Sequence, residues 1–110
     1  MIPINDRYIT KRDGSKITLR YVVRNQHIST TTIYLDGLQI YHGNDNDILL
    51  DVGMDTVILN KRIDIYSDIL KFSTKEIQCD LYMFGGTISR HWRETSNNNR
   101  DNFEAHILIR

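Results

Sequence analysis

Apolar and polar residues alternate with a period of two along much of the chain. Three segments show the pattern most clearly, namely residues 16–24, 76–84 and 103–109. Their alternating apolar members are Ile17, Leu19, Tyr21 and Val23, then Ile77, Cys79, Leu81 and Met83, and finally Phe103, Ala105, Ile107 and Ile109. Successive side chains of a strand point to opposite faces of a sheet. This period therefore predicts strands that bury one face and expose the other.

Turn residues separate the apolar segments. Asp36-Gly37 lies between residues 30–35 and 38–41, and such a pair between two alternating runs predicts a hairpin with a type I′ turn. In the same way, Gly53-Met54-Asp55 predicts a hairpin of residues 48–52 and 56–60. We expect further strands at residues 8–11 and 87–93, and further turns at residues 12–15, 43–47, 85–86 and 97–99.

Residues 62–72 are the one segment for which the pattern does not decide between strand and helix. Ile63 and Ile65 alternate as in a strand, but the apolar residues of this segment also fit one face of a helix. Period alone does not decide between the two for a short apolar run. We favour a strand over residues 62–66, followed by strand or irregular structure up to Phe72.

Composition and spacing predict the fold class. The chain has 110 residues with 16 Ile, 9 Thr and 6 Tyr but a single Ala, which favours strands over helices. Eight to ten short strands, about ten residues apart, are typical of sandwiches, jelly rolls and small barrels. We therefore expect one all-β domain over residues 1–110, an antiparallel β-sandwich or jelly roll, with a small barrel as the alternative.

Several classes of protein are excluded by simple counts. One cysteine cannot form a disulfide framework within the chain. No apolar run approaches the roughly 18 residues of a membrane span, and residues 1–7 lack the apolar stretch of a signal peptide. We therefore expect a protein without a membrane span, located in the cytoplasm or in a virion.

Charge is balanced over the whole chain but not along it. The formal net charge is zero, yet residues 1–24 carry +4, residues 25–60 carry −5 and residues 61–110 carry +1. These blocks predict either a bipolar surface or strands of opposite charge that pair and cancel, and we favour the second. Because a neutral chain offers little general attraction to phosphates, we do not expect a nucleic-acid partner.

We expect no metal or other cofactor. The aspartates at 45, 47, 51 and 55 suggest a calcium loop, but Ile48-Leu49-Leu50 interrupts the ligand pattern of the helix-loop-helix motif, which leaves only a looser loop site. The histidines lack the short spacings of a zinc site. They are His27, His42, His91 and His106, and we expect them at surface or half-buried strand positions.

Catalytic groups are equally sparse. Cys79 lies within an apolar alternation, where a free cysteine packs as a small hydrophobic residue rather than acting as a nucleophile. A carboxylate pair for glycoside chemistry would have to come from Asp64, Asp68, Glu76 or Asp80, and their separation does not follow from sequence. We therefore expect a protein that is not an enzyme.

The segment Arg90-His91-Trp92-Arg93 is the most suggestive surface feature. Alternation places Trp92 with Arg90 on one face, and His91 with Arg93 on the other. A tryptophan beside arginines can stack on a sugar, a base or a partner's peptide, and Tyr34, Tyr41 and Tyr82 would extend such an aromatic platform. The alternative, which we favour, is that Trp92 belongs to the core of the sandwich.

These observations favour binding over catalysis. We expect a structural or assembly subunit that contacts other protein subunits in a homo- or hetero-oligomer, for example an accessory, decorating or connector protein of a virus or phage particle. The alternative is a β-sandwich module that binds carbohydrate or another small ligand. The candidate contact residues are Arg90, Trp92, Arg93, Tyr34 and Tyr41.

Overall fold

A computed structural model describes all residues from Met1 to Arg110 as nine strands and one short helix, with 63% of the chain in strands. The strands are β1 (Ile4–Tyr8), β2 (Lys16–Val23), β3 (Ile28–Leu35), β4 (Leu38–Gly43), β5 (Asp47–Met54), β6 (Arg62–Leu70), β7 (Ile77–Phe84), β8 (Arg90–Ser96) and β9 (Arg100–Ile109). The one helix is α1 (Asp55–Ile58). With four residues, it cannot span a membrane.

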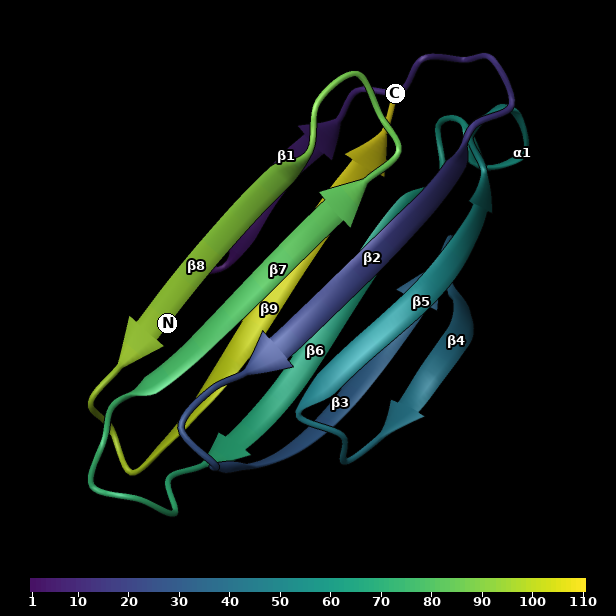
Figure 1. Cartoon of the computed structure of the whole chain (residues 1–110). Coiled ribbons are helices and arrows are strands. Elements are labelled where there is room, and N and C mark those ends of the chain that lie inside the picture. The colour runs from purple at the N-terminus through teal and green to yellow at the C-terminus, as the bar shows by residue number, and fades with distance from the viewer.

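The strands form two facing sheets (Figure 1). The five-stranded sheet has the order β1-β9-β6-β3-β4, and the four-stranded sheet has the order β5-β2-β7-β8. Neither sheet closes on itself, so the fold is a sandwich and not a barrel. Both sheets have two edge strands. β1 and β8 lie at one side of the sandwich, and β4 and β5 lie at the other.

The core fills the space between the sheets with the residues that alternation predicts. The inward members of β2, β7 and β9 are all buried, and Tyr21 packs its ring against Phe103 with centroids 4.9 Å apart. Fully burying an aliphatic side chain contributes about 1.5–3 kcal/mol, so these strands are held mainly by their inner faces. The predicted all-β sandwich and its alternating strand faces are confirmed.

The turn at Asp36-Gly37 is confirmed as well. It joins β3 to β4, and both residues have positive φ, 51° for Asp36 and 83° for Gly37. A type I′ turn requires positive φ at both central positions, which aspartate tolerates and glycine adopts freely. The open question over residues 62–72 is settled too, because β6 is one continuous strand.

Two expectations about the strands are wrong in part. The first strand is residues 4–8, not 8–11, and it pairs with β9 in parallel, from Ile4 opposite Ala105 to Tyr8 opposite Ile109. The sheets are therefore antiparallel except at this edge. β8 also begins at Arg90, three residues later than expected, because residues 85–89 form a longer turn.

The expected second hairpin is absent. After β5 the chain enters the helical turn α1 instead of a strand at residues 56–60. The Asp55 carboxylate is completely buried and accepts the backbone N–H of Gly14 at 2.8 Å, which ties this turn to the loop between β1 and β2. Ile58 is buried beside it in the core. These contacts with a distant loop override the local strand preference.

Candidate functional site

The first side of the sandwich is closed by side chains that join β1 to β8. Trp92 is half-buried and packs against the core, and its Nε1 donates to the Asp6 carboxylate at 3.0 Å. Arg90 donates to the same oxygen at 2.7 Å and lies over the Trp92 ring, 4.7 Å from its centroid. Tyr8 adds a second bridge, because its hydroxyl donates to the Ile88 carbonyl at 2.8 Å. Trp92 thus serves the closure of the two sheets.

The aromatic platform, which was the less favoured interpretation of the sequence, does not form, because its members lie in separate places. Tyr34 is on the outer face of the five-stranded sheet, where it meets Tyr66 edge-on. Tyr41 is on the edge strand β4 and donates its hydroxyl to Asp45 at 2.8 Å. Tyr82 is on the other sheet, where it stacks on His91 with centroids 4.4 Å apart.

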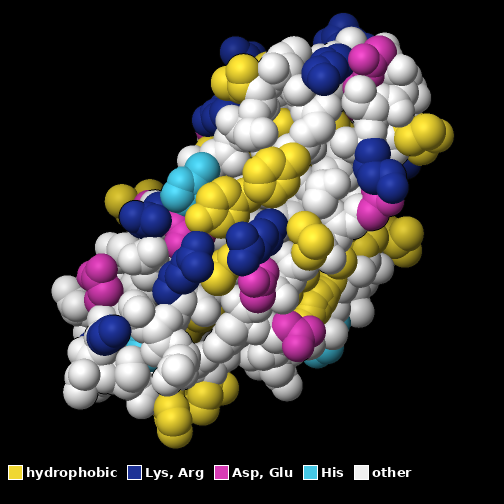
Figure 2. All heavy atoms as spheres, in the orientation of Figure 1, with side chains coloured by type: hydrophobic (Ala, Val, Ile, Leu, Met, Phe, Trp, Pro, Cys, Tyr) yellow, Lys and Arg dark blue, Asp and Glu magenta, His cyan; other side chains and the backbone are white.

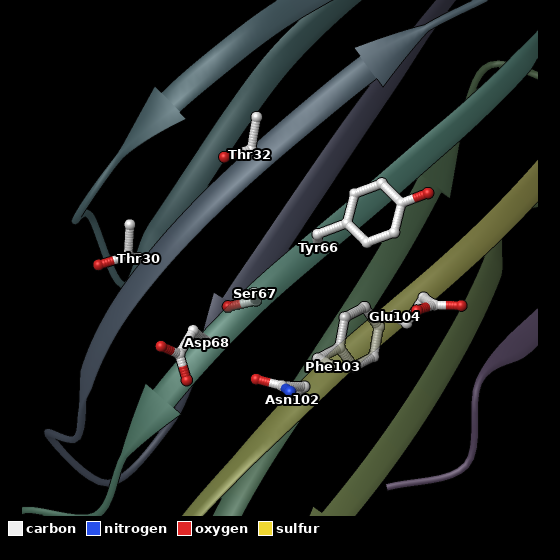
Figure 3. A pocket seen from close by; sticks show the side chains of 8 residues that line it. All are labelled: Thr30, Thr32, Tyr66, Ser67, Asp68, Asn102, Phe103 and Glu104. Atoms are coloured by element: carbon white, nitrogen blue, oxygen red, sulfur yellow. The ribbon is translucent and has the colours of Figure 1, made fainter. Parts of the chain in front are cut away.

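A polar hollow occupies the outer face of the five-stranded sheet over β3, β6 and β9 (Figure 3). It has a volume of about 380 Å³, which is at the lower end of the range for small-ligand sites. Its lining residues are Thr30, Thr32, Tyr66, Ser67, Asp68, Asn102, Phe103 and Glu104. No sequence motif marks this hollow, because its hydroxyl, amide and carboxylate groups come from three strands distant in the chain.

His106 lies next to this hollow between two carboxylates. Its Nδ1 contacts Asp64 at 2.5 Å and its Nε2 contacts Glu104 at 2.9 Å. Ionised carboxylates only accept hydrogen bonds, so both ring nitrogens act as donors. Partial burial alone would lower the pKa of His106, but these two hydrogen bonds outweigh it and raise the pKa. Neither nitrogen is free to exchange a proton with a ligand.

The second side of the sandwich, at β4 and β5, is open. No hydrogen bond joins β4 to β5, and each strand has only one neighbour in its sheet. Large apolar side chains are exposed here, and Figure 2 shows hydrophobic side chains along the border formed by β5. The exposed apolar residues of β4, β5 and α1 are Leu38, Leu49, Met54 and Val57.

Opposite charges pair across neighbouring strands, as favoured from the sequence. Arg20 of β2 binds Asp47 of β5 at 2.7 Å, and Lys16 binds Asp51 at 3.1 Å. The basic first block therefore cancels part of the acidic second block. Asp47 and Asp51 are held in these ion pairs, and Asp55 is buried at α1. The aspartates that suggested a calcium loop therefore do not converge on one point.

Two further candidate residues, Cys79 and His27, are buried. Cys79 is buried, and burial raises the pKa of its thiol to about 12. His27 is not at a surface or half-buried strand position as expected. It is buried in the turn between β2 and β3, where its Nδ1 accepts the Phe72 N–H at 3.0 Å. No group of three or more His, Cys, Asp or Glu side chains is arranged to hold a metal ion.

Arg93, the last of the predicted contact residues, lies on the outer face of the four-stranded sheet. Its Nε donates to Asp80 at 2.8 Å. His91 shares that face, so the predicted split of the segment, with Trp92 and Arg90 inward, is confirmed. The sequence places Asp80 outward but gives no sign that its side chain is fully covered.

The chain is thus an all-β sandwich with one closed side, one open side and a polar hollow on its larger sheet. Comparisons of the chain with models of protein families, with curated proteins and with solved structures found no match. Function is therefore inferred from the residues of this chain alone.

Proposed function

We propose that the chain is a non-enzymatic assembly subunit that associates with a second copy of itself through the open edge of β5. The single observation that carries the proposal is the difference between the two sides of the sandwich. Side-chain hydrogen bonds and an ion pair join β1 to β8 across the two sheets, whereas no hydrogen bond joins β4 to β5 and their edges carry exposed apolar side chains. An unprotected edge is a template for pairing with another chain.

The usual devices that protect an edge are scarce at this side. Residues 25–60 contain no Lys, Arg or Pro, and these are the residues that most often prevent edge pairing. A β-bulge interrupts the ladder of each edge strand, which limits regular pairing to shorter runs. The longest such run is residues 47–51 of β5, opposite Val22 to Thr18 of β2.

The sequence of this run suits antiparallel pairing with itself. A two-fold axis at Leu49 places Leu49 opposite its own copy and Asp47 opposite Asp51. Cross-strand apolar pairs stabilise a sheet, and Leu49 is 68% exposed in the single chain. Arg20 and Lys16 already neutralise the two aspartates within each copy, so pairing does not bring unbalanced negative charges together.

The side chains that could act in catalysis are buried or already hydrogen-bonded, which supports a binding role over a catalytic one. The thiol of Cys79 is buried, and His106 uses both ring nitrogens on carboxylates. Asp80 accepts hydrogen bonds on both of its oxygens. The virus or phage setting expected from the sequence stays a prediction, as do hetero-oligomeric partners.

The molar mass in solution tests the proposal. Light scattering after size exclusion, from about 10 µM to about 1 mM, covers the range of weak self-association. The wild-type mass should rise towards that of a dimer, whereas Leu49→Lys should stay monomeric because a charge enters the new interface. Ile88→Lys is the matched control, since Ile88 is 66% exposed at the closed side. A monomeric wild type at the highest concentration, or equal behaviour of the two variants, contradicts the proposal.

Carbohydrate binding is the second candidate, and the polar hollow favours it. Hydroxyl, amide and carboxylate groups around the half-exposed ring of Tyr66 match the groups that sugars present (Figure 3). Trp92 lies at the far edge of the other sheet, so tryptophan fluorescence would not report on this hollow. Amide chemical shifts during titration with neutral disaccharides should move around Tyr66 and Asn102. Tyr66→Ala should abolish those shifts and Tyr82→Ala should not, and shifts that avoid the hollow rule this candidate out.

A further inference from the structure

A buried carboxylate lies at the centre of the outer face of the four-stranded sheet. Asp80 occupies an outward position of β7, yet its side chain has no exposed surface. Its Oδ2 accepts from Arg24 Nε at 2.9 Å and from Gln78 Nε2 at 3.0 Å. Its Oδ1 accepts from His91 Nε2 at 2.7 Å and from Arg93 Nε at 2.8 Å. The carboxylate therefore has two donors on each oxygen and no capacity left for a ligand.

This carboxylate is ionised over the whole ordinary pH range. Burial alone would raise the pKa of Asp80, but the hydrogen bonds from Arg93, Gln78, Arg24 and His91 outweigh it and hold the pKa well below its usual value. A buried charge with four donors fixes the geometry of those donors, because each would lose a strong hydrogen bond by moving. Asp80 thus positions the side chains around it.

The two arginines keep donors that no protein group uses. Arg93 makes its hydrogen bond through Nε alone, so both of its Nη groups lack a protein acceptor. Arg24 uses Nε on Asp80 and Nη2 on the Tyr82 hydroxyl at 3.0 Å, which leaves Nη1 without a partner. Both guanidinium groups are partly exposed to solvent. Their free N–H groups are therefore available to an acceptor from outside.

Among the arginines that bind carboxylates, only those at Asp80 outnumber the carboxylates that they bind. Arg20, Arg62, Arg90 and Arg100 each have a carboxylate of their own. At Asp80 one negative charge faces two guanidinium groups, an excess of one, which becomes two when His91 is protonated. Asp47 is also within electrostatic reach of Arg24, but it is already bound to Arg20. The excess matches one phosphate group and is too small for a polynucleotide backbone.

Aromatic rings extend from the cluster along the same face. Tyr82 stacks in parallel with His91, and Phe84 continues the row with its centroid 6.2 Å from that of Tyr82. Figure 2 shows basic side chains and a histidine around hydrophobic side chains on this face, over β2 and β7. His91 and the Arg20 guanidinium lie against the Tyr82 ring, and Phe84 is 37% exposed. The row thus places partly exposed aromatic rings on the same face as the free arginine donors, which suits a ring attached to an anionic group.

We infer that this face binds the phosphate monoester of a small, ring-bearing molecule, with the phosphate on Arg24 and Arg93 and the ring along Tyr82 and Phe84. Two guanidinium groups fit a phosphate better than a carboxylate, because a phosphate has three oxygens to share between them. Asp80 is a positioning residue in this site, since it contacts the arginines and not the ligand. The inference does not depend on association through β5, which lies at the edge of the same sheet.

Titration with phenyl phosphate at low salt, followed by ¹H–¹⁵N NMR, tests this site. The Nε–H signals of Arg24 and Arg93 and the amide of Tyr82 should shift together and saturate, with a dissociation constant of about 1 mM or below. Inorganic phosphate has the same anionic group without the ring and should bind more weakly. Shifts that do not saturate, or equal affinities for the two probes, overturn the inference.

Substitutions on the two sheets distinguish specific binding at this site from a general electrostatic attraction of the anionic probe to the protein. Arg93→Gln should weaken phenyl phosphate binding at least about tenfold, which is a loss of about 1.4 kcal/mol. Arg100→Gln removes an exposed arginine from the opposite sheet and should leave binding unchanged. Equal loss in both variants contradicts a built site. Arg24→Gln repeats the test at a second position of the site, and the dispersion of the amide spectrum verifies that each variant is folded.

Discussion

Replacing Asp80 by asparagine should destabilise the protein far more than the same change at Asp68. Both carboxylates bind arginine on the outer face of a sheet, but the side chain of Asp80 is 0% exposed and that of Asp68 is 45% exposed. Asparagine offers one carbonyl oxygen and presents an NH₂ group to donors that need an acceptor. The substitution therefore leaves several donors around position 80 without a partner.

The size of the effect follows from the burial of these groups. Breaking a fully buried ion pair costs about 3–5 kcal/mol, and the partial exposure of Arg24 and Arg93 to water reduces the expected cost of Asp80→Asn to about 2 kcal/mol. For a domain of this size the melting temperature should fall by about 8 °C. Asp68→Asn removes an exposed pair with Arg100, which contributes at most about 1 kcal/mol.

The difference between wild type and Asp80→Asn should depend on pH. The pKa of Asp80 is lower in the folded state than in the unfolded chain. Its contribution to stability is therefore complete above the unfolded value of about 3.9 and disappears as the pH falls through the folded value. The difference in the free energy of unfolding should be constant from neutral pH to about pH 5 and shrink at lower pH.

Urea unfolding followed by circular dichroism measures all of these quantities. Wild type, Asp80→Asn and Asp68→Asn are compared at pH 7, and the first two are compared again at about pH 3. Equal losses of stability in the two variants at pH 7 would refute the argument that Asp80 organises the face. A difference between wild type and Asp80→Asn that stays the same at low pH would refute the assignment of the effect to its ionised carboxylate.

Three further predictions concern the interior and the hollow. The Tyr21 hydroxyl is buried and makes no hydrogen bond of ordinary geometry, although the side chains of Cys79 and Ser67 lie beside it. Tyr21→Phe should therefore raise the free energy of unfolding by about 1 kcal/mol in urea unfolding, and a loss would contradict this. Cys79 should not react with Ellman's reagent at pH 8 in the native protein but should react in urea, because its thiol is buried and its pKa is raised to about 12. The pKa of His106 is raised by Asp64 and Glu104, so its stabilising effect is complete below about pH 6.5 and is lost as the pH rises through the folded value. His106→Gln should therefore destabilise more at pH 6 than at pH 9, and the reverse order would exclude this charge assignment.

Features that depend on local chemistry were predictable from the sequence. Strand faces follow from alternation because a shift by one residue would expose every apolar side chain of the strand. This is why the buried faces of β7 and β9 were assigned correctly from Ile77 and Phe103 onwards. The turn at Asp36-Gly37 was predictable for a similar reason, since its positive φ angles are set by the two residues themselves.

Features decided by contacts distant in sequence were not predictable. Asp55 directs α1 because its carboxylate binds the loop at Gly14, and no local pattern reports that contact. The parallel edge arises because β1 pairs with β9, almost the full length of the chain away. Asp80 has the sequence signature of an ordinary solvent-facing residue, and only the folded positions of Arg24 and Arg93 make it the centre of a site.

Hydrogen–deuterium exchange at low and high protein concentration tests the role of the β5 edge most directly. Amides of residues 47–51 that point away from β2 should exchange quickly in dilute protein and become protected as the concentration rises, because a second copy then supplies acceptors. Amides of β8 should not change with concentration. Protection that is independent of concentration, or that appears at β8 and not at β5, would contradict association through this edge.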